Sequence, residues 1–527
     1  MEENQGESQI RKSFAGANIL LTGGTGFLGK LLIEKLLRCC PELNKIYLLV
    51  RKKKNMDPQT RLKEQFDDVL YETLHKDQPD FIKKVEILEG EMDSENLGLT
   101  DQDWLTVCDK VNFILHGAAT VRFDEPLSKA VRINTRGTKE MLTLARCCKY
   151  LKSFVYISTA YCNLPQQPIE EKFYDFPLTS DLLIDVVERL DSKTVDDITP
   201  GLIGVYPNTY CFTKAAAENH LLKHSQGLPV AILRPSVVIS TAKGPIPLGW
   251  IDNIYGPTGI SVGASVGIIR LVKCNPDAVA DFVPADFVAN ACIAVAWKTA
   301  RHHEKTCERK LDDYSEVPKD EEAKHDQIPR VYNYVSGNQN PITIRTFMHY
   351  AHTHGIKLVS TKAVWCYMLF LVNNARLFKT VNILLHWIPA YVCDGVAVMI
   401  GKKPMLKKVY SKIDKWTHFN EIFASHTWKM KNSNTVELLR ELNETDRHIF
   451  DFDISALDWN SYMYNYMMGI RLYLIKDSKE AIPRGIKKQY FLKIANYIVM
   501  TIYGITLFWF VKLLGGGVLK LMYKIFS

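Results

Sequence analysis

The pattern of apolar and polar positions from Ala17 to about Lys298 predicts strands that alternate with helices. Short runs of strand-forming residues, among them Lys45–Val50 and Phe154–Ile157, are separated by longer stretches with helical spacing. This alternation is typical of an α/β fold with a doubly wound parallel sheet and helices on both faces. Val331–Val335 has the pattern of a further strand that returns to the sheet.

Three other regions depart from this alternation. Residues 1–13 are polar, lack the apolar stretch of a secretory signal and predict an N-terminal arm. Residues 301–330 are rich in charge and poor in apolar side chains, which predicts a mobile surface insertion. Beyond residue 355 the spacing turns helical, so we expect a smaller helical domain over residues 355–476.

A charge-free run of 18 residues, Ile494–Val511, lies between Lys493 and Lys512. As a helix it would be about 27 Å long, close to the thickness of a bilayer core. We therefore predict a transmembrane or membrane-anchoring segment over residues 490–512, because a buried helix of this length would show a stronger polar stripe. Residues 513–527 are too short to span again, so a shallow hairpin or an interfacial tail is the alternative.

A glycine-rich loop links a predicted strand to a predicted helix near the start of the chain. Ile19–Leu32 reads ILLTGGTGFLGKLL. A strand, a glycine-rich turn and a helix in this order form a Rossmann-type dinucleotide site. Glycine allows close approach of the pyrophosphate, and the helix N-terminus supplies free N–H groups. The predicted cofactor-binding residues are Thr22, Gly23, Thr25, Gly26, Phe27, Leu28 and Gly29. An ordinary glycine-rich turn is the alternative.

Basic residues follow the second predicted strand, where this architecture contacts the adenosine ribose. An acidic residue there would hydrogen-bond the 2′-hydroxyl of NAD. Arg51 instead offers a planar set of donors for a 2′-phosphate, and Lys52 adds a charge. The predicted cofactor is therefore NADPH. Lys53 and Lys54 fit a solvated basic loop better.

Candidate catalytic residues lie in Asn208–Glu218, which reads NTYCFTKAAAE. Tyr210 and Lys214 are four residues apart and share one face of a helix. A tyrosine with its ordinary pKa of about 10 is a weak catalyst at neutral pH, and a neighbouring ammonium lowers that pKa. An earlier predicted strand ends in two hydroxyl residues able to bind a substrate oxygen: Thr159 or, less favoured, Ser158. A buried helix aromatic is the alternative for Tyr210.

Together these residues resemble the Ser/Thr–Tyr–Lys set of the extended short-chain dehydrogenase/reductases. Further motifs resemble one family, the alcohol-forming fatty acyl-CoA reductases, over roughly residues 14–476. These motifs are His116–Glu125, Asn134–Thr138, Leu233–Val238, Gly249–Pro257, Trp387–Tyr391, Gly401–Pro404, Asp458–Trp459 and Gly469–Leu474. Small departures at Gly244–Trp250 and Pro284–Asp286 leave the catalytic set intact but bear on the substrate pocket.

The resemblance implies an NADPH-binding extended reductase domain over residues 14–350 and the family's C-terminal domain over residues 355–476. It implies reduction of a fatty acyl-CoA to an aldehyde and then, with a second NADPH, to a primary alcohol. Asn134, on a helix predicted over Pro126–Lys149, is a further catalytic candidate, placed to support the active-site water or backbone. Further cofactor contacts are expected at Ala118, Ala119, Tyr210, Lys214, Pro235 and Val237, with Lys214 holding the nicotinamide ribose.

Composition and charge narrow the partners. The formal net charge of +8 suits CoA, NADPH or an anionic membrane, but none of these uniquely. The sequence contains no basic and aromatic module that would indicate nucleic acid. The 12 cysteines are scattered without a Cys-x-x-Cys pair, which predicts a reducing compartment, no disulfide framework and no metal site. An oligomer is possible.

The expected location is a cytosolic catalytic region held by the C-terminus at the endoplasmic reticulum or peroxisome membrane. Ala363–Val372 and Val381–Ile388 are strongly apolar and form either a helical core or an entrance for a long acyl chain beside the bilayer. Two rival functions remain. One is another membrane-bound reductase of a lipid or steroid carbonyl, such as a hydroxysteroid dehydrogenase/isomerase. The other is a non-catalytic NADPH-binding membrane sensor or scaffold.

Overall fold

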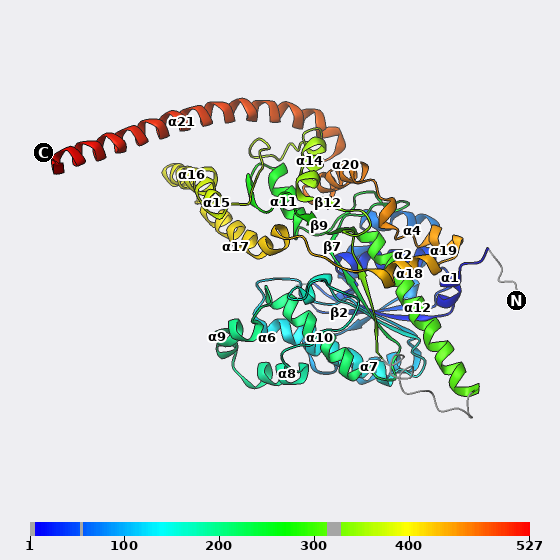
Figure 1. Ribbon diagram of the computed structural model, residues 1–527. Coiled ribbons are helices and arrows are strands. Elements are labelled where there is room, and N and C mark those ends of the chain that lie inside the picture. The colour runs from blue at the N-terminus through cyan, green and yellow to red at the C-terminus, as the bar shows by residue number, and fades with distance from the viewer. Residues whose placement is uncertain (1–5, 53–55, 313–327, 527) are drawn as a thin grey trace.

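A seven-stranded parallel sheet forms the centre of the molecule (Figure 1). The computed structural model describes residues 6–52, 56–312 and 328–526. The strands are β1 (Asn18–Thr22), β2 (Lys45–Val50), β3 (Val85–Glu89), β4 (Phe113–His116), β5 (Ser153–Ile157), β6 (Val230–Pro235) and β11 (Arg330–Tyr334). Their order is β11-β6-β5-β4-β1-β2-β3, and it changes direction between β1 and β4. In such a sheet, ligands bind at the carboxyl ends of the strands beside this point. The predicted doubly wound sheet and its returning strand are confirmed.

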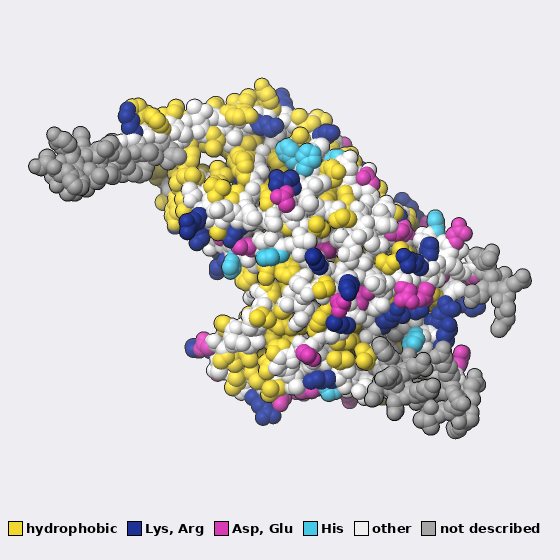
Figure 2. All heavy atoms as spheres, in the orientation of Figure 1, with side chains coloured by type: hydrophobic (Ala, Val, Ile, Leu, Met, Phe, Trp, Pro, Cys, Tyr) yellow, Lys and Arg dark blue, Asp and Glu magenta, His cyan; other side chains and the backbone are white. Residues whose placement is uncertain are grey.

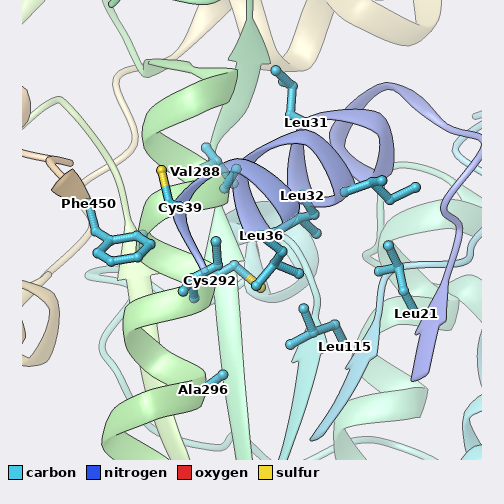
Figure 3. Close-up of a cluster of buried hydrophobic side chains, with 14 of the residues drawn as sticks. Leu21, Leu31, Leu32, Leu36, Cys39, Leu115, Val288, Cys292, Ala296 and Phe450 are labelled. Carbon is cyan, nitrogen blue, oxygen red and sulfur yellow. The ribbon is translucent and has the colours of Figure 1, made fainter. Parts of the chain in front are cut away.

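Helices cover both faces of the sheet. On one face lie α2 (Phe27–Cys39) and α12 (Ala285–Asp312), and on the other α5 (Asp101–Lys110), α7 (Gly137–Cys147) and α10 (Thr209–His224). Figure 3 shows the layer between α2, α12 and the strands, which is filled by Leu21, Leu31, Leu32, Leu36, Leu115, Val288, Cys292 and Ala296. This packing holds the first turn of α2 against the carboxyl ends of the strands.

Shorter elements surround this core. The remaining helices of the first part are α1 (Gln9–Phe14), α3 (Pro58–Phe66), α4 (Glu72–Asp77), α6 (Leu127–Ala130), α8 (Ser180–Arg189), α9 (Ser192–Ile203) and α11 (Pro257–Ser265). Three two-stranded sheets are formed by β7 (Val237–Ile239), β8 (Leu271–Lys273), β9 (Val279–Ala280), β10 (Phe282–Pro284), β12 (Ile342–Thr343) and β13 (Phe370–Val372). Later helices are α14 (Ile344–Gly355), α15 (Ala375–Asn382), α16 (Ile388–Met399), α17 (Leu406–Ser425), α18 (Ser433–Glu441), α19 (Glu444–Ile449), α20 (Trp459–Gly469) and α21 (Ile482–Phe526).

The N-terminal arm differs from its prediction. Residues 9–14 form α1, which Ser8 caps by accepting the Arg11 N–H at 3.0 Å. Ile10 and Phe14, four residues apart, are fully buried against the core of the sheet domain. A single helical turn with two apolar residues gives too short a pattern to stand out in a polar segment.

Two other segments also differ from the sequence expectations. Residues 301–312, predicted as the start of a mobile insertion, continue α12 as helix, and residues 313–327 lie outside the described part of the chain. The helix predicted over Pro126–Lys149 is present as α6 and α7, joined by a π-helical turn at Val131–Arg136.

The predicted helical region after residue 355 is present, and it packs against the earlier part of the chain. Its helix α20 shares a core with α11, α14 and the small strands. Its later segment, residues 433–454, returns to the sheet domain, where Leu438, Phe450 and Phe452 join the core of α2 and α12. The Tyr334 hydroxyl of β11 donates a hydrogen bond to the Phe452 carbonyl at 2.7 Å.

Helices α15, α16 and α21 lie at one end of the molecule (Figure 1), where Figure 2 shows apolar side chains gathered at the surface. By length and hydropathy, one helical stretch among the described residues, Ala375–Met399, is able to cross a membrane. The predicted membrane segment at residues 490–512 lies within α21, and part of it falls outside the residues whose side chains are described.

Candidate functional site

The glycine-rich loop lies where β1 meets α2, at the point where the strand order changes. Gly23 has a φ of +77°, and a Cβ on it would lie 2.8 Å from the carbonyl carbon of Gly117. A Cβ on Gly29 would lie 2.2 Å from the Gly23 carbonyl oxygen, so α2 packs directly on the turn. The backbone N–H groups of the first turn of α2, which begins at Phe27, have no partner within the helix. This cradle fits the pyrophosphate of a dinucleotide and would be closed by side chains at the two glycines.

Two arginines converge beyond β2. Arg61 of α3 donates to Thr25 Oγ1 at 2.7 Å and to the Arg51 carbonyl at 3.3 Å. Burial and, secondarily, the charge of Arg51 lower the pKa of Arg61. Arg51 is half-exposed and lies 3.7 Å from Glu91, while Lys52 lies 3.5 Å from Glu89. An anion near the two guanidinium groups would relieve their repulsion, which fits the 2′-phosphate of NADPH.

The carboxyl end of β4 is held by hydrogen bonds through His116. The Thr138 hydroxyl donates to the Asn134 carbonyl, so it accepts from His116 Nε2 at 3.1 Å. The other ring nitrogen, Nδ1, then accepts from the Thr22 hydroxyl at 2.7 Å, and Thr22 Oγ1 in turn accepts the Ala118 N–H at 3.1 Å. Burial, aided by the charge of Lys214, lowers the pKa of His116 to about 3. The neutral ring thereby fixes the loop that carries Ala118 and Ala119.

Asn134, in the π-helical turn, joins this loop to α10. Its Oδ1 accepts the Thr120 N–H at 2.9 Å, and its Nδ2 donates to the Thr120 carbonyl at 3.1 Å and to Thr213 Oγ1 at 3.0 Å. Both amide hydrogens and one acceptor position of Asn134 are thus used by protein groups. Asn134 therefore supports the backbone beside the site.

The predicted catalytic residues meet between the end of β5 and the start of α10. The Thr159 hydroxyl hydrogen-bonds the Tyr210 phenol and also accepts the Tyr161 N–H at 3.3 Å. Ser158 is turned instead toward Cys162, at 3.8 Å. The Lys214 ammonium donates to the Ile157 carbonyl at 2.8 Å.

The ionisation of Tyr210 differs from the sequence expectation. Burial raises the pKa of Tyr210, and the Thr159 hydrogen bond is the one opposing influence among the described residues. Lys214, expected to lower the pKa of Tyr210, instead directs its charge to the Ile157 carbonyl. Burial lowers the pKa of Lys214 itself to about 8. At neutral pH the site therefore holds a protonated phenol beside a largely charged amine.

Relatives of known name are similar to this chain over most of their length. Two family models, both described as male sterility protein, match residues 21–292 and 385–477. Fatty acyl-CoA reductase wat of Drosophila melanogaster is 36% identical over 94% of this chain and 92% of its own. Fatty acyl-CoA reductase 1 of Rattus norvegicus is 37% identical over 91% of this chain and 88% of its own. The chain belongs to the fatty acyl-CoA reductase family.

Solved structures support the fold of this reductase. The reductase domain of a nonribosomal peptide synthetase from Mycobacterium tuberculosis is 17% identical, with a TM-score of 0.56 over 88% of this chain and 96% of its own. The terminal reductase domain of the myxalamid pathway is 20% identical, with a TM-score of 0.55 over 87% of this chain and 91% of its own. At these identities the likeness concerns the fold alone.

A buried ion pair, which the sequence motifs did not reveal, positions α10 in this reductase. Arg234 of β6 donates to both carboxylate oxygens of Glu218, from Nε at 2.9 Å and from Nη2 at 2.5 Å. Arg234 also donates to the carbonyls of Glu170 and Lys172. Glu218 lies one turn beyond Lys214, so the pair fixes α10 to the sheet. A glutamate four residues after the lysine was the available sequence signal.

The end of β6 brings two further predicted cofactor residues to the same edge of the sheet. Pro235 ends β6, and Val237 begins β7 with its N–H donated to the Asp281 carbonyl at 3.2 Å.

An aromatic cluster that includes one residue of the C-terminal region lies beside Tyr210. The Phe423 ring of α17 lies 5.3 Å from Phe123 and 5.1 Å from Tyr161, and Phe123 lies 5.9 Å from Tyr210, measured between ring centroids. Phe423 is 213 positions after Tyr210 and belongs to no motif, so the sequence did not indicate it. Phe423 packs against Phe123, and Phe123 is the apolar neighbour of Tyr210.

The structure also brings together Asp181, His220 and His224, with possible ligand atoms within 4.8 Å of one another. The sequence suggested no metal site. His224 Nε2 hydrogen-bonds Asp181 at 3.0 Å, and the Lys139 ammonium lies 3.5 Å from the same carboxylate. These contacts account for the cluster as a link between α8 and α10, and we assign no metal to it.

Proposed function

We propose that this reductase converts long-chain fatty acyl-CoA thioesters to primary alcohols with NADPH. The observation that carries the proposal is the meeting of Thr159, Tyr210 and Lys214 at the end of β5, beside the dinucleotide cradle. The names of the relatives supply the substrate class. A protein that only bound the cofactor would have no need of the three side chains.

In this proposal the residues of the chain hold and move a proton at the substrate oxygen. Tyr210 keeps its proton at neutral pH because burial raises its pKa, and the phenol donates this proton to the reacting carbonyl oxygen. The Thr159 hydroxyl is a second donor to the developing oxyanion, and its geometry favours it over Ser158. NADPH, when bound, supplies the hydride that attacks the carbonyl carbon.

Lys214 is assigned to the ribose of the bound cofactor and supplies positive charge to the pocket. The first reduction gives a hemithioacetal, which expels CoA as the thiol and leaves an aldehyde. The second reduction uses the same two hydroxyl donors on the aldehyde oxygen and gives the alcohol. Two hydrides and two protons are consumed for each thioester.

The test is a product balance on the purified full chain with NADPH and palmitoyl-CoA. We expect two NADPH oxidised for each thiol released and each alcohol formed. Oxidation of one NADPH with aldehyde as the final product would reject alcohol formation. NADPH binding without thiol release would favour the non-catalytic alternative, and turnover of a steroid ketone instead of the thioester would favour the other rival.

We assign the selectivity for NADPH over NADH to Arg51. Arg61, which donates a hydrogen bond to the Arg51 carbonyl, holds Arg51 in place. Loss of a charge-assisted contact to the 2′-phosphate in Arg51→Ala should weaken NADPH binding by about 10- to 150-fold and leave NADH binding unchanged. Lys45→Ala is the matched control and should leave the binding of both cofactors unchanged, because Lys45 begins β2 at the opposite edge of the sheet and pairs with Glu86 at 3.0 Å. Equal weakening of both cofactors in Arg51→Ala, measured by fluorescence titration, would give Arg51 a structural role.

The membrane is proposed as a partner through α21, with the catalytic region in the cytosol at the endoplasmic reticulum or peroxisome. Between Tyr497 and Trp509, exposed apolar side chains occur on all sides of α21. The base of α21 is attached to the body, where Trp365 Nε1 donates to Asn496 Oδ1 at 2.8 Å. A chain ending after Tyr497 keeps this contact and should appear in the high-speed supernatant. Protease added to intact microsomes should digest most of the full chain.

A further inference from the structure

A second apolar surface lies on the helix formed by α15, the π-helical turn Ile383–Trp387 and α16. We call residues 375–400 the interfacial helix. Its outward side chains are between 51% and 79% exposed, although they are apolar: Leu377, Ile383, Tyr391, Val392, Val398 and Met399. An exposed apolar strip along a whole helix marks a contact with another apolar phase.

The opposite face of the interfacial helix is attached to the body by polar contacts along its length. Trp387 Nε1 and Asn382 Nδ2 donate to the carboxylate of Asp414, at 2.9 and 3.2 Å. Asp394 accepts three backbone N–H groups at the start of α17, each at 2.9 Å. His386 accepts the Arg270 N–H at 3.1 Å. A helix held in this way cannot separate from the body to cross a bilayer alone, although its length and hydropathy would permit it.

We propose that the interfacial helix lies in the plane of the membrane, with its apolar side chains in the bilayer surface, as a second contact beside α21. Both helices occupy the same end of the molecule (Figures 1 and 2), so one bilayer can cover both surfaces. The exposed side chain of Tyr391 is of the type that sits at headgroup depth. The proposal rests on the membrane location proposed above.

The charges around the interfacial helix match an anionic lipid surface. Six exposed basic residues border it: Arg376, Lys379, Lys402, Lys403, Lys407 and Lys408. The Lys407 ammonium lies 4.5 Å from the centroid of the Tyr391 ring, so charge and apolar side chain occur together. Basic residues beside an apolar helical face are typical of helices bound in the interface of anionic membranes. A twofold dimer through the same face would bring the cations of two copies together, which disfavours a second copy as the occupant.

The interfacial helix is joined to the active site by α17. This helix begins at Leu406, just after the apolar strip, and reaches Phe423 in the aromatic cluster beside Tyr210. Its 20 residues correspond to a length of about 30 Å. A long acyl chain stored in the bilayer therefore has a continuous protein element between the membrane surface and the reacting carbonyl.

The decisive experiment measures the depth of the interfacial helix in the full chain reconstituted in phosphatidylcholine/phosphatidylserine vesicles. An environment-sensitive nitrobenzoxadiazole label is placed at Val396→Cys or at Leu377→Cys, after serine replaces the exposed Cys147, Cys307 and Cys393. The two positions are 19 residues apart, or about 28 Å along a helix. Val205→Cys, where Val205 is 78% exposed on the sheet domain, is the matched control.

We expect both labels on the interfacial helix to shift to the blue and to be quenched at least twofold by doxyl lipids, at similar depths. The label at position 205 should keep the emission wavelength that it has in aqueous solution. A depth difference that approaches the helix length would mean that the helix spans the bilayer, and unquenched blue emission would mean that protein covers it. Either result would overturn the proposal. So would an aqueous emission wavelength for the labels at both position 377 and position 396. Resistance of the full chain to carbonate extraction reports α21 anchoring separately, because a helix that only lies in the interface does not withstand carbonate.

A charge variant gives a second test without a label. Val392→Asp with Val396→Asp should raise the KM for palmitoyl-CoA presented in vesicles at least threefold and leave turnover of a short, soluble acyl-CoA unchanged. An unchanged KM for the vesicle-borne substrate would overturn the contact. Absence of turnover on both substrates in the parent enzyme would instead refute the proposed function.

Discussion

Helix α10, which carries the candidate catalytic residues, and the interfacial helix depart in different ways from the usual pattern of apolar residues inside and polar residues outside. In α10 the charged residues Lys214 and Glu218 are buried, at 2% and 3% exposure. In the interfacial helix apolar residues such as Met399 are exposed, at 79%, while Asn382 and Asp394 lie inside. These four buried polar side chains have fixed partners in the protein.

The difference between the helices follows from the medium that each one faces. Burial of a charge costs several kcal/mol unless a partner and hydrogen bonds compensate. In α10 Arg234 and the Ile157 carbonyl provide this compensation, and the site gains a shifted pKa. The interfacial helix needs no such compensation on its outer face, because lipid would replace water there.

The largest effect is expected from Tyr210→Phe, which removes the proton donor but keeps the ring. Alcohol formation should fall by about 10²- to 10⁴-fold, because general acid catalysis contributes on this scale. NADPH binding, followed by cofactor fluorescence, should be unchanged. Wild-type rates of alcohol formation in this variant would remove the catalytic assignment.

Breaking the ion pair behind α10 should have the next largest effect. Glu218→Ala leaves Arg234 buried and uncompensated, which should lower the free energy of unfolding by about 3–5 kcal/mol. The double variant Glu218→Leu with Arg234→Met should lose less, because no charge remains. The control is Asp197→Ala, since the exposed pair of Lys193 and Asp197 at 2.8 Å should not move the urea midpoint. Equal midpoints for the Glu218 and Asp197 variants would mean that the buried pair does not hold the helix.

The pH profile tests the buried amine. As pH rises through about 8, Lys214 loses its proton, so kcat/KM for reduction should fall about tenfold per unit above that value. Tyr210 adds no loss in this range, since burial raises its pKa. Lys214→Arg retains the charge, and its profile should remain flat through pH 9. An unchanged fall in that variant would assign the titration to another group.

The smallest effect concerns α17, which connects the two regions. Phe423→Leu loses two aromatic contacts and should raise the KM for palmitoyl-CoA by roughly two- to tenfold. Phe419→Leu, on the same helix, is the control and should leave KM unchanged. If both variants behave alike, α17 acts as a support and does not touch the substrate.

Much of the fold was predictable because parallel strands buried on both faces are continuous apolar runs. β2 and β5 are such runs, and they were predicted from local sequence alone. The return of residues 433–454 to the sheet was not predictable, because Phe450 finds its partners on α2 and α12, hundreds of residues earlier. The helical start of the charged 301–330 segment was also missed, since α12 extends beyond its buried part.

The candidate site likewise has one part that the local sequence predicts and another part that depends on tertiary packing. The glycine loop and the spacing of Tyr210 and Lys214 are local patterns, and their chemistry follows from spacing. Arg61 and Phe423 reach the site only through tertiary packing. The direction of the Lys214 ammonium depends on a carbonyl of another strand, which spacing on one helix cannot reveal.

The hydrogen bond between Ser8 and Asp446, at 2.5 Å across 438 positions, sets an order of events during synthesis. A ribosome that adds about 5–20 residues per second needs on the order of 20 to 90 s to pass from one residue to the other. Throughout that interval α1 lacks the carboxylate that also binds the backbone N–H groups of Gln9 and Ile10. A nascent chain should therefore remain open to protease at its N-terminus until residue 446 emerges, long after the dinucleotide cradle has been made.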